Sequence, residues 1–496
     1  MKLLFKFVSG SAFLALALSV KSVSAKGAAD QFWPQWRGPS QTGVAPTADP
    51  PTTWSESENI KWKVNLPGSG NATPIIWGDQ IFIQAAIPTG KKVESTKAES
   101  DPPPPTPPGR AGDGPRPGGP PPGGPGAEGR GPVPDGKGSG GPPPGGFRGP
   151  GGGRGRFGGA PPSEIQQFVL ICLDRKTGKT LWQQVAKEEL PHEGFREGDG
   201  TFASPSGLTD GKNVYAYFGS HGLYCYDMSG KLQWSQDLGK MRILLTFGEG
   251  SSPTLYKDTL IINWDNEDGS FITALDKNTG KTLWKEKREE RTSWATPLVV
   301  EHDGKAEVVT AATGKIRSYD IATGKLLWEC AGLTRNVIPS PVADAEKVYC
   351  ISGFQGSSLL AIKLGGSGDL TGSDSVAWTH KKSTPYVPSP LLYEGKLYFY
   401  AVNNGRISCL DSKSGNVMID AEPLEELSMV YASPVGAAGK IYLPGRNGVT
   451  VVLKQSDKLE KLATNKLDDK FDASPAAVGK ELFLRGQKTL YCIAEK

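Results

Sequence analysis

The stretch Ala274-Leu-Asp-Lys-Asn-Thr-Gly-Lys-Thr-Leu-Trp284 decides the fold, because its pattern recurs along the chain. The pattern consists of a small residue, an Asp two positions later, a Thr-Gly pair and a Trp, and it recurs at Cys172–Trp182 and Ser318–Trp328. Asp caps a tight turn by accepting from backbone N–H groups, and Gly takes the positive φ that such a turn needs. The pattern therefore predicts two antiparallel strands joined by a tight turn, with the Trp opening the second strand.

Working outward, a small residue followed by Pro precedes an apolar run in every repeat. Pro has no backbone N–H, so it suits the start of a strand better than the middle. The pairs from Pro205 onward lie roughly 41–49 residues apart, a period typical of propeller blades. The eight pairs are Thr73-Pro74, Ser204-Pro205, Ser252-Pro253, Thr296-Pro297, Ser340-Pro341, Ser389-Pro390, Ser433-Pro434 and Ser474-Pro475.

A repeat of this length holds about four short strands and cannot cover both of its faces alone. Residues 26–496 are therefore predicted to form one all-β domain, an eight-bladed β-propeller of four-stranded antiparallel blades. The last repeat ends at Lys496 without room for a fourth strand, so the N-terminal strand pattern Asn59–Val64 is predicted to close the ring. A Gly/Ser-rich insertion stretches the turn before Trp378. The residues predicted to dock each blade on the next are Trp62, Trp182, Trp234, Trp284, Trp328 and Trp378.

Two segments differ from the propeller in composition. Residues 1–25 have a basic start, a short apolar stretch and small residues before Ala25, which is typical of a secretory signal peptide. We expect an exported protein without a transmembrane segment, in the periplasm or on the cell surface after cleavage near Ala25. Residues 92–163 interrupt the first blade, and their Pro/Gly/Arg-rich composition predicts a disordered insertion.

Charge, cysteines and histidines exclude several functions. The formal net charge is +4, and its excess lies in the signal peptide and the insertion, so a nucleic-acid partner is not expected. Four of the six cysteines fall in the small-residue position of the repeat and are interpreted as structural thiols, whereas Cys330 and Cys350 could pair. The four histidines lie on different repeats, so neither a metal site nor a catalytic triad is predicted from local sequence.

The channel mouth is the best candidate site, because residues just before innermost propeller strands point to the axis. Oxygen atoms of Glu249, Asn336 and Asp472 could bind Ca²⁺, Trp294 could stack on a planar ring, and Arg335 could bind a carboxylate. A polar, water-filled funnel without a ligand is the alternative, and no catalytic residue is assigned. Thr201, Tyr386 and Tyr431 belong to the same set.

The repeat signature resembles that of pyrroloquinoline quinone (PQQ) dehydrogenases and of their non-catalytic relatives, including the assembly lipoprotein BamB. The opening Trp33-Pro-Gln-Trp-Arg-Gly-Pro39 is similar to exported PQQ-like repeat proteins of planctomycete-type bacteria. For the dehydrogenases, this resemblance implies PQQ and Ca²⁺ in the central channel, with a catalytic Asp and often two adjacent cysteines. The sequence has no adjacent Cys pair, no Cys-x-x-Cys-His haem site and no lipidated Cys after the apolar stretch.

Three functions follow as hypotheses. The first is an exported, non-catalytic scaffold for protein partners that needs no cofactor. The second is a PQQ/Ca²⁺-dependent alcohol or sugar dehydrogenase, in which Asp472 or Glu249 would act as the base or a Ca²⁺ ligand. The third is a polysaccharide-binding surface module that uses Trp33, Trp36 and the channel aromatics.

Overall fold

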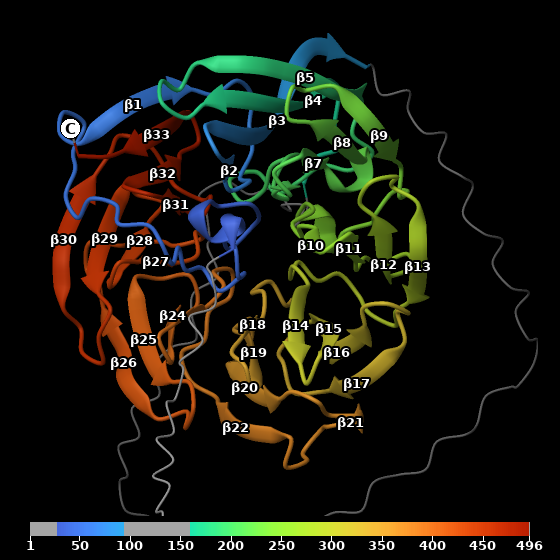
Figure 1. The fold of residues 1–496 in the computed structure, drawn as a ribbon, viewed down its shortest axis with the longest axis vertical. Helices are drawn as coiled ribbons and strands as arrows, with labels where there is room; N and C mark the ends of the chain where they lie inside the picture. The colour runs from blue at the N-terminus through green and yellow to red at the C-terminus, as the bar shows by residue number, and fades with distance from the viewer. Residues whose placement is uncertain (1–26, 94–158, 496) are drawn as a thin grey trace, which may run out of the picture. The chain divides into compact units, whose positions relative to one another are not determined.

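Eight β-sheets surround a central axis in the computed structural model, which describes residues 27–93 and 159–495 (Figure 1). The predicted all-β, eight-bladed propeller is confirmed. The only helices in the described residues are three short 3₁₀ turns, η1 (Ala28–Gln31), η2 (Gly219–His221) and η3 (Leu244–Thr246). None of the described helices is long and apolar enough to cross a membrane. The predicted signal peptide and almost all of the predicted insertion lie outside the described residues.

Each blade contains four strands ordered from the axis outward, and one blade has a fifth strand at its outer edge. Blades 1 to 8 are numbered from the blade that contains β2. The innermost strands are β2 (Ile75–Trp77), β6 (Leu208–Thr209), β10 (Thr254–Tyr256), β14 (Leu298–His302), β18 (Val342–Ala343), β23 (Leu391–Tyr393), β27 (Val435–Ala437) and β31 (Ala476–Val478). The second strands are β3 (Gln80–Lys92), β7 (Asn213–Tyr217), β11 (Thr259–Trp264), β15 (Lys305–Thr310), β19 (Lys347–Ser352), β24 (Lys396–Tyr400), β28 (Lys440–Pro444) and β32 (Glu481–Arg485).

The outer half of each blade carries the repeat signature. The third strands are β4 (Glu164–Asp174), β8 (Leu223–Asp227), β12 (Phe271–Asp276), β16 (Ile316–Asp320), β20 (Ser358–Lys363), β25 (Arg406–Asp411), β29 (Val449–Lys454) and β33 (Thr489–Ile493). The outermost strands are β5 (Thr180–Glu189), β9 (Leu232–Gln236), β13 (Thr282–Lys287), β17 (Leu326–Cys330), β22 (Val376–His380), β26 (Val417–Pro423), β30 (Lys461–Lys466) and β1 (Ile60–Asn65).

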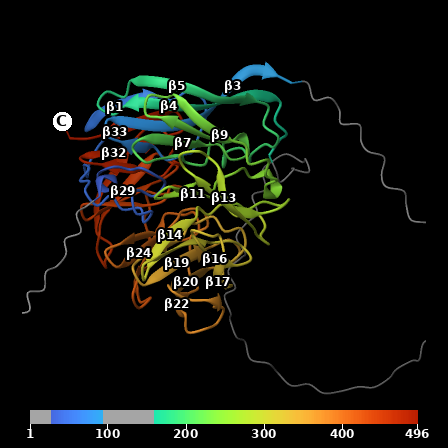
Figure 2. The ribbon, with the colours of Figure 1, turned by 45° about the vertical axis from the view of Figure 1, so that its right-hand side comes forward.

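Strand β1 completes the last blade, as predicted from the missing fourth strand. It pairs antiparallel with β33, with Trp62 opposite Cys492 and Val64 opposite Leu490. Because β1 comes from the start of the propeller and β33 from its end, one blade joins the two ends and closes the ring. In blade 1, β3, β4 and β5 are longer than the other strands, and β3 extends past its neighbours in Figure 2.

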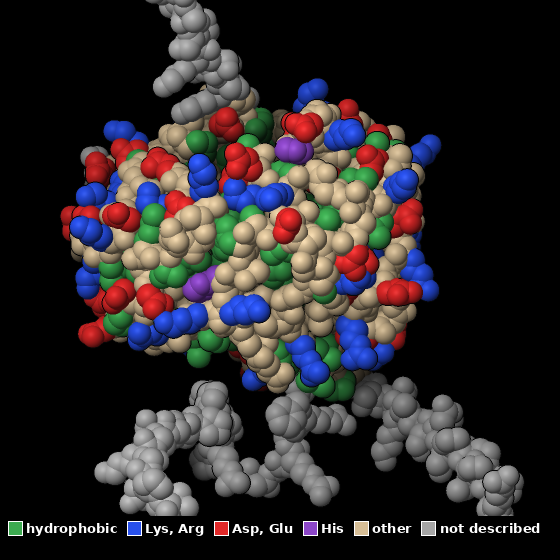
Figure 3. Space-filling view, turned by 90° about the horizontal axis from the view of Figure 1, so that it is seen from below, with side chains coloured by type: hydrophobic (Ala, Val, Ile, Leu, Met, Phe, Trp, Pro, Cys, Tyr) green, Lys and Arg blue, Asp and Glu red, His purple; other side chains and the backbone are tan. Residues whose placement is uncertain are grey.

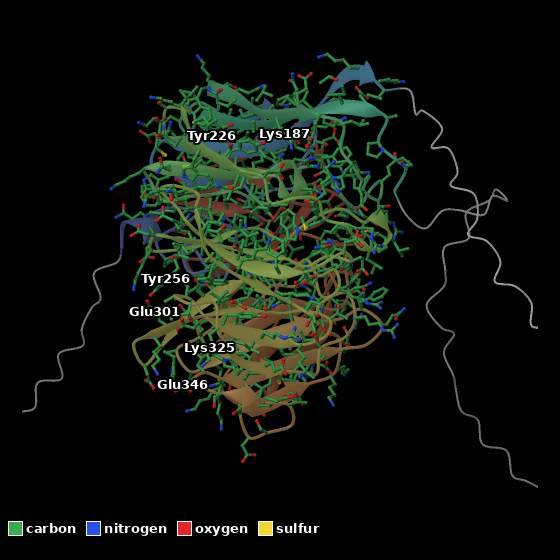
Figure 4. The ribbon with its side chains drawn as sticks, turned by 90° about the vertical axis from the view of Figure 1, so that its right-hand side faces the viewer. Lys187, Tyr226, Tyr256, Glu301, Lys325 and Glu346 are labelled. Atoms are coloured by element: carbon green, nitrogen blue, oxygen red, sulfur yellow. The ribbon has the colours of Figure 1, made fainter. Side chains whose placement is uncertain are left out.

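Burial follows the position of each strand in its blade. The second and third strands are covered on both faces by adjacent blades, so all residues of β19 and β32 are buried. Outermost strands such as β1 alternate between partly buried and exposed residues. Contacts also join neighbouring blades near their turns, where the Tyr256 hydroxyl of β10 donates to Glu301 of β14 (Figure 4).

The small residue of the signature lies directly opposite the Trp position across the third and outermost strands. Cys172 faces Trp182, Ala274 faces Trp284, and Val452 faces Ala463 in a blade that has no Trp. A large side chain opposite an indole would overfill the interface between blades, which explains why Cys, Ala, Ser and Val share this position.

Blade 4 carries a fifth strand that the sequence did not predict. The Gly/Ser-rich insertion of blade 5 forms β21 (Gly368–Asp369), which pairs parallel with the outer edge of β17. Trp328 lies opposite Gly368, and the insertion helps to cover it completely. The insertion therefore does not merely lengthen a turn but also covers an edge that other blades leave open.

The small residues that precede the innermost strands form a circular hydrogen-bonded chain around the axis, which we call the hydroxyl ring. In seven successive pairs, a backbone N–H donates to the hydroxyl of the next blade at 2.9–3.0 Å. The Thr73 hydroxyl closes the ring by donating to the Ser474 carbonyl at 3.2 Å. In blade 2 the ring residue is Ser206, which follows Pro205, whereas in the other blades the ring residue precedes the proline. The reason is that β6 starts later relative to Pro205 than the other innermost strands do relative to their prolines.

Candidate ligand-binding cup in the central channel

A cavity of about 310 Å³ occupies the central channel, and we call it the cup. Six residues of the hydroxyl ring line it, and all six are more than nine-tenths buried: Ser252, Thr296, Ser340, Ser389, Ser433 and Ser474. Each of these hydroxyl oxygens accepts a backbone N–H from the preceding blade. No residue in the described part of the chain accepts a hydrogen bond from them, so their O–H groups are free to donate.

The chain's own N-terminal segment crosses one end of the channel. Residues 33–45 bond to blade 1 through Trp33 and Ile76, and to blade 7 through Ala45 and Gly436. We call residues 33–45 the plug. The plug spans the channel beneath the hydroxyl ring, so the cup opens only toward the loops that precede the innermost strands. These loops form what we call the mouth face.

Arg37 anchors the plug. Its guanidinium donates to the carbonyls of Pro434 at 2.6 Å, Pro390 at 2.5 Å and Thr42 at 3.1 Å. The side chain is buried, and none of the ion pairs among the described residues includes it. Burial lowers the pKa of Arg37 to about 9. Gln41 donates to Thr254 and to the Pro297 carbonyl on the other side of the channel.

Aromatic side chains form much of the cup wall. Trp36 comes from the plug, whereas Phe247, Trp294, Tyr386 and Tyr431 come from loops of the mouth face. The Trp294 indole N–H donates to the Gly248 carbonyl at 2.7 Å, which fixes the orientation of its ring. Tyr386 stacks on Phe354 with ring centroids 4.8 Å apart.

The long connection between blades 1 and 2 reaches across the mouth. Asp199 of this connection accepts the Tyr431 hydroxyl at 2.9 Å and contacts Arg446 at 3.4 Å. Arg446 binds both oxygens of Asp472, at 2.5 and 3.0 Å, and lies over the Tyr431 ring. Arg196 pairs with Asp199 at 3.0 Å. The two aspartates at the mouth are therefore already neutralised by two arginines.

Glu249 is the one cup carboxylate without a cationic partner among the described ion pairs. Its Oε2 accepts the backbone N–H of Ser220 at 2.8 Å. Burial raises the pKa of Glu249 to about 7, and the hydrogen bond from Ser220 opposes this only in part. Its other oxygen, Oε1, receives no hydrogen bond from the described residues and can accept one from a ligand.

The structure brings together only part of the predicted channel set. Glu249, Trp294 and Asp472 line the cup, as do Tyr386 and Tyr431. Arg335 and Asn336 do not line it. Arg335 is exposed and forms a β-bridge with Phe354, and the backbone of Asn336 takes a positive φ of 52°. Because side-chain direction in such a loop depends on local turns, the repeat alone could not place these two residues.

Thr201 lies in a small recess beside the cup, together with His192 and His221. The rings of these histidines are 5.9 Å apart, although the two residues come from different repeats. The imidazole Nδ1 of His221 pairs with Glu189 at 2.6 Å, and burial lowers the His221 pKa. Sequence reasoning separated these histidines because it counted repeats and could not follow the connection that carries His192.

The docking tryptophans meet the next blade in a repeated way. In five blades the indole N–H donates to the backbone carbonyl of the residue that follows the signature Asp of the next blade. These five are Trp62, Trp182, Trp234, Trp284 and Trp378. Each of these indoles lies over the glycine of the same turn. Trp328 differs, because its N–H donates to Glu307 of its own blade at 2.9 Å.

Arg196, Asp199 and Phe247 are cup residues that the sequence analysis missed. It also missed Arg446, which pairs with Asp199 and Asp472. For Arg196 and Asp199 the available signal was the unusual length of the blade 1 to blade 2 connection, since long connections often carry binding residues. The six cysteines are all free and buried, so Cys330 and Cys350 do not pair.

The donors of the cup do not fit PQQ with Ca²⁺. Ca²⁺ takes six to eight oxygen ligands in most protein sites. Of the three predicted ligands, Asp472 is bound by Arg446 and Asn336 lies outside the cup. The described residues contain no group of three or more His, Cys, Asp or Glu side chains arranged to hold a metal. A polyanionic quinone would also face Glu249 without a cation to balance it.

The family is now defined by comparison. Residues 166–421, just over half of the chain, match the PQQ_2 family model described as outer membrane protein assembly factor BamB. The chain belongs to this family of PQQ-like β-propeller repeat proteins. A search of curated proteins finds no match.

Solved structures agree on the fold. The quinohemoprotein alcohol dehydrogenase of Comamonas testosteroni is similar with a TM-score of 0.57 and 11% identity, over 94% of this chain and 81% of that one. A quinohemoprotein alcohol dehydrogenase of Pseudomonas putida HK5 gives 0.52 and 9%, over 93% and 80%. At such low identity the likeness shows the fold alone.

Proposed function

We propose that this protein is an exported, non-catalytic β-propeller that presents its mouth face to a protein partner. The observation that carries this proposal is a set of exposed apolar side chains on strained backbone around the mouth. Leu245 is 52% exposed with a φ of 49°, and Val402 is 46% exposed with a φ of 55°. A β-branched residue such as Val rarely takes a positive φ, and strain of this kind concentrates at functional positions.

A third exposed apolar side chain extends this surface. Met429 is 40% exposed, and the Val430 N–H next to it donates to the carbonyl of Asn403, which follows Val402. Val402 and Met429 therefore lie together on one side of the mouth, and Leu245 belongs to the connection between blades 2 and 3. Neighbouring exposed apolar side chains, such as Val402 and Met429, are typical of protein interaction sites.

Charge on the side of the ring that Figure 3 shows does not point to one class of partner. The side of the ring in Figure 3 shows Lys and Arg interspersed with Asp and Glu, without a continuous region of one sign. Electrostatic steering of a highly charged partner would need such a region.

Site-specific photo-crosslinking in cells tests the scaffold. A photoreactive residue replaces Leu245 or Val402, and matched controls replace Leu283 or Leu462, which are similarly exposed on the outermost strands. We expect a single, defined cross-linked product from the two mouth positions and none from the controls. Equal cross-linking from all four positions, or none from the mouth, would contradict the proposal.

Export and lack of catalysis have separate tests. N-terminal sequencing of protein from the periplasmic or external fraction should give a chain that starts near Lys26. Calorimetric titration of the mature chain with PQQ, with and without Ca²⁺, should show no saturable binding. Ca²⁺-dependent binding together with dye reduction in the presence of an alcohol would establish the dehydrogenase alternative instead.

A further inference from the structure

We propose that the cup binds one neutral, polyhydroxylated ring of monosaccharide size, either free or as the end of a glycan. This inference concerns the channel and not the rim residues of the scaffold proposal, so either can fail without the other. Four features of the cup carry it: its closed end, its free hydroxyl donors, its aromatic walls and its balance of charge.

The closed end restricts what can enter. The plug crosses the channel and is held by Arg37 on blades 6 and 7 and by Gln41 on blades 3 and 4. A polymer therefore cannot pass through the propeller. The volume of about 310 Å³ lies at the lower limit of small-molecule sites. A single ring or a chain end fits these limits, whereas the interior of a polysaccharide does not.

The hydroxyl ring supplies the donors. Because each hydroxyl oxygen of the ring already accepts a hydrogen bond from a backbone N–H, its own O–H remains available to donate to a ligand. Six such O–H groups line one cup and come from six different blades. A buried donor without a partner costs free energy, so this arrangement favours a ligand or waters rich in acceptor oxygens. A sugar ring presents hydroxyl oxygens around its whole edge and can accept from several blades at once.

The walls supply flat apolar surfaces. Trp294 is held by its bond to Gly248, and Tyr386 by its stacking on Phe354, so both surfaces are fixed before a ligand arrives. Trp36 offers a third surface from the plug. The C–H faces of a sugar ring are apolar and pack on aromatic rings, and a rigid aromatic surface lowers the entropic cost of binding.

The charges favour a neutral ligand. Asp199 and Asp472 are paired with Arg196 and Arg446, so neither sign dominates the mouth. Glu249 leaves Oε1 free to accept from a ligand hydroxyl. An anionic ligand would meet this carboxylate, and a cationic ligand would lie above the uncompensated guanidinium of Arg37. A ligand that both donates and accepts without net charge meets neither cost.

Saturation-transfer NMR on the mature full-length chain tests the proposal. The neutral probes are glucose, galactose, mannose, myo-inositol and maltose, and the charged probes are choline and citrate. β-Cyclodextrin serves as a glucan without an end. We expect saturable transfer to at least one neutral probe, weaker or no transfer to the charged probes, and none to β-cyclodextrin. Absence of binding by all neutral probes, or preference for a charged probe or for β-cyclodextrin, would overturn the proposal.

Variants locate the binding. Trp294→Leu removes one stacking surface and should weaken binding about tenfold, while Tyr256→Leu, at the end of β10 and outside the cup, should leave it unchanged. Urea denaturation establishes that both variants fold. If Trp294→Leu does not fold, Glu249→Gln replaces it, and a weaker interaction is again expected. Unchanged binding in a folded cup variant would place the ligand elsewhere and refute the assignment.

Discussion

Substituting Trp328 by Ala should destabilise the propeller more than the same change at any other docking Trp. Trp328 is fully buried and packs between blades 4 and 5, with Val348 and Leu360 in the same core cluster. Removing so large a buried side chain costs about 3–5 kcal/mol. The change also removes the donor to Glu307, which adds about 1–3 kcal/mol for a buried acceptor left short of a partner. We expect a total loss of about 4–8 kcal/mol in the free energy of unfolding.

Urea denaturation followed by circular dichroism measures this loss, with two controls. Trp328→Phe keeps much of the packing but removes the N–H, so it should lose about 1–3 kcal/mol. Trp182→Ala removes a half-buried indole that donates to the Met228 carbonyl, and it should lose clearly less than Trp328→Ala. If Trp328→Ala loses no more than Trp182→Ala, then the cover provided by β21 and the bond to Glu307 do not have the energetic role described above.

Other predictions concern turns, protonation and the insertion. Gly280→Ala should destabilise the propeller more than Gly304→Ala. Both glycines have a φ near +70°, but only a new Cβ at position 280 would lie 2.6 Å from the Trp234 ring. The urea midpoints of the two variants test this difference. Glu249→Gln should raise the free energy of unfolding above pH 7 by up to about 3 kcal/mol and leave it unchanged below pH 4.5. The reason is that folding raises the pKa of Glu249 to about 7, so the unsubstituted protein loses stability as the pH rises and this carboxyl group ionises. Thermal scans at several pH values would reveal this, and a constant difference between the two proteins would contradict it. Deleting residues 101–157 should leave the melting temperature almost unchanged, since their composition offers little apolar surface to bury, and loss of folded protein would show the opposite.

The repeat made the architecture predictable because its parts have local physical causes. The Thr-Gly turn, the strand-opening Pro and the missing last strand are each visible in sequence, so the number of blades and the closing strand followed. The place of Ser206 in the hydroxyl ring was not predicted, because Ser206 and Gly207 lie between Pro205 and the strand. Strand β21 was missed because a Gly-rich segment gives no strand signal and pairs only with an edge that another blade supplies.

The cup was only partly predictable because it is built from connections. Glu249, Trp294 and Asp472 were found since they directly precede innermost strands. Arg446 and Asp199 were not found, because they are distant in sequence and meet only where the folded chain brings them together at the mouth. The blocked channel could not be predicted from the sequence either. The Trp-Arg-Gly segment was noted only as part of a family resemblance, which does not say where the segment lies in the fold.

Sharing of blade 8 between β1 and β33 has a consequence for how the chain acquires its structure. Ile60–Asn65 is made long before its partner Thr489–Ile493. Strand β1 must therefore remain unpaired until Thr489–Ile493 has been made. Contacts between such distant segments slow folding, and an unpaired strand edge is open to wrong pairing in the meantime. A chain cut before Thr489 would leave β1 without its partner and the ring open, so the arrival of β33 is the step that permits the propeller to close.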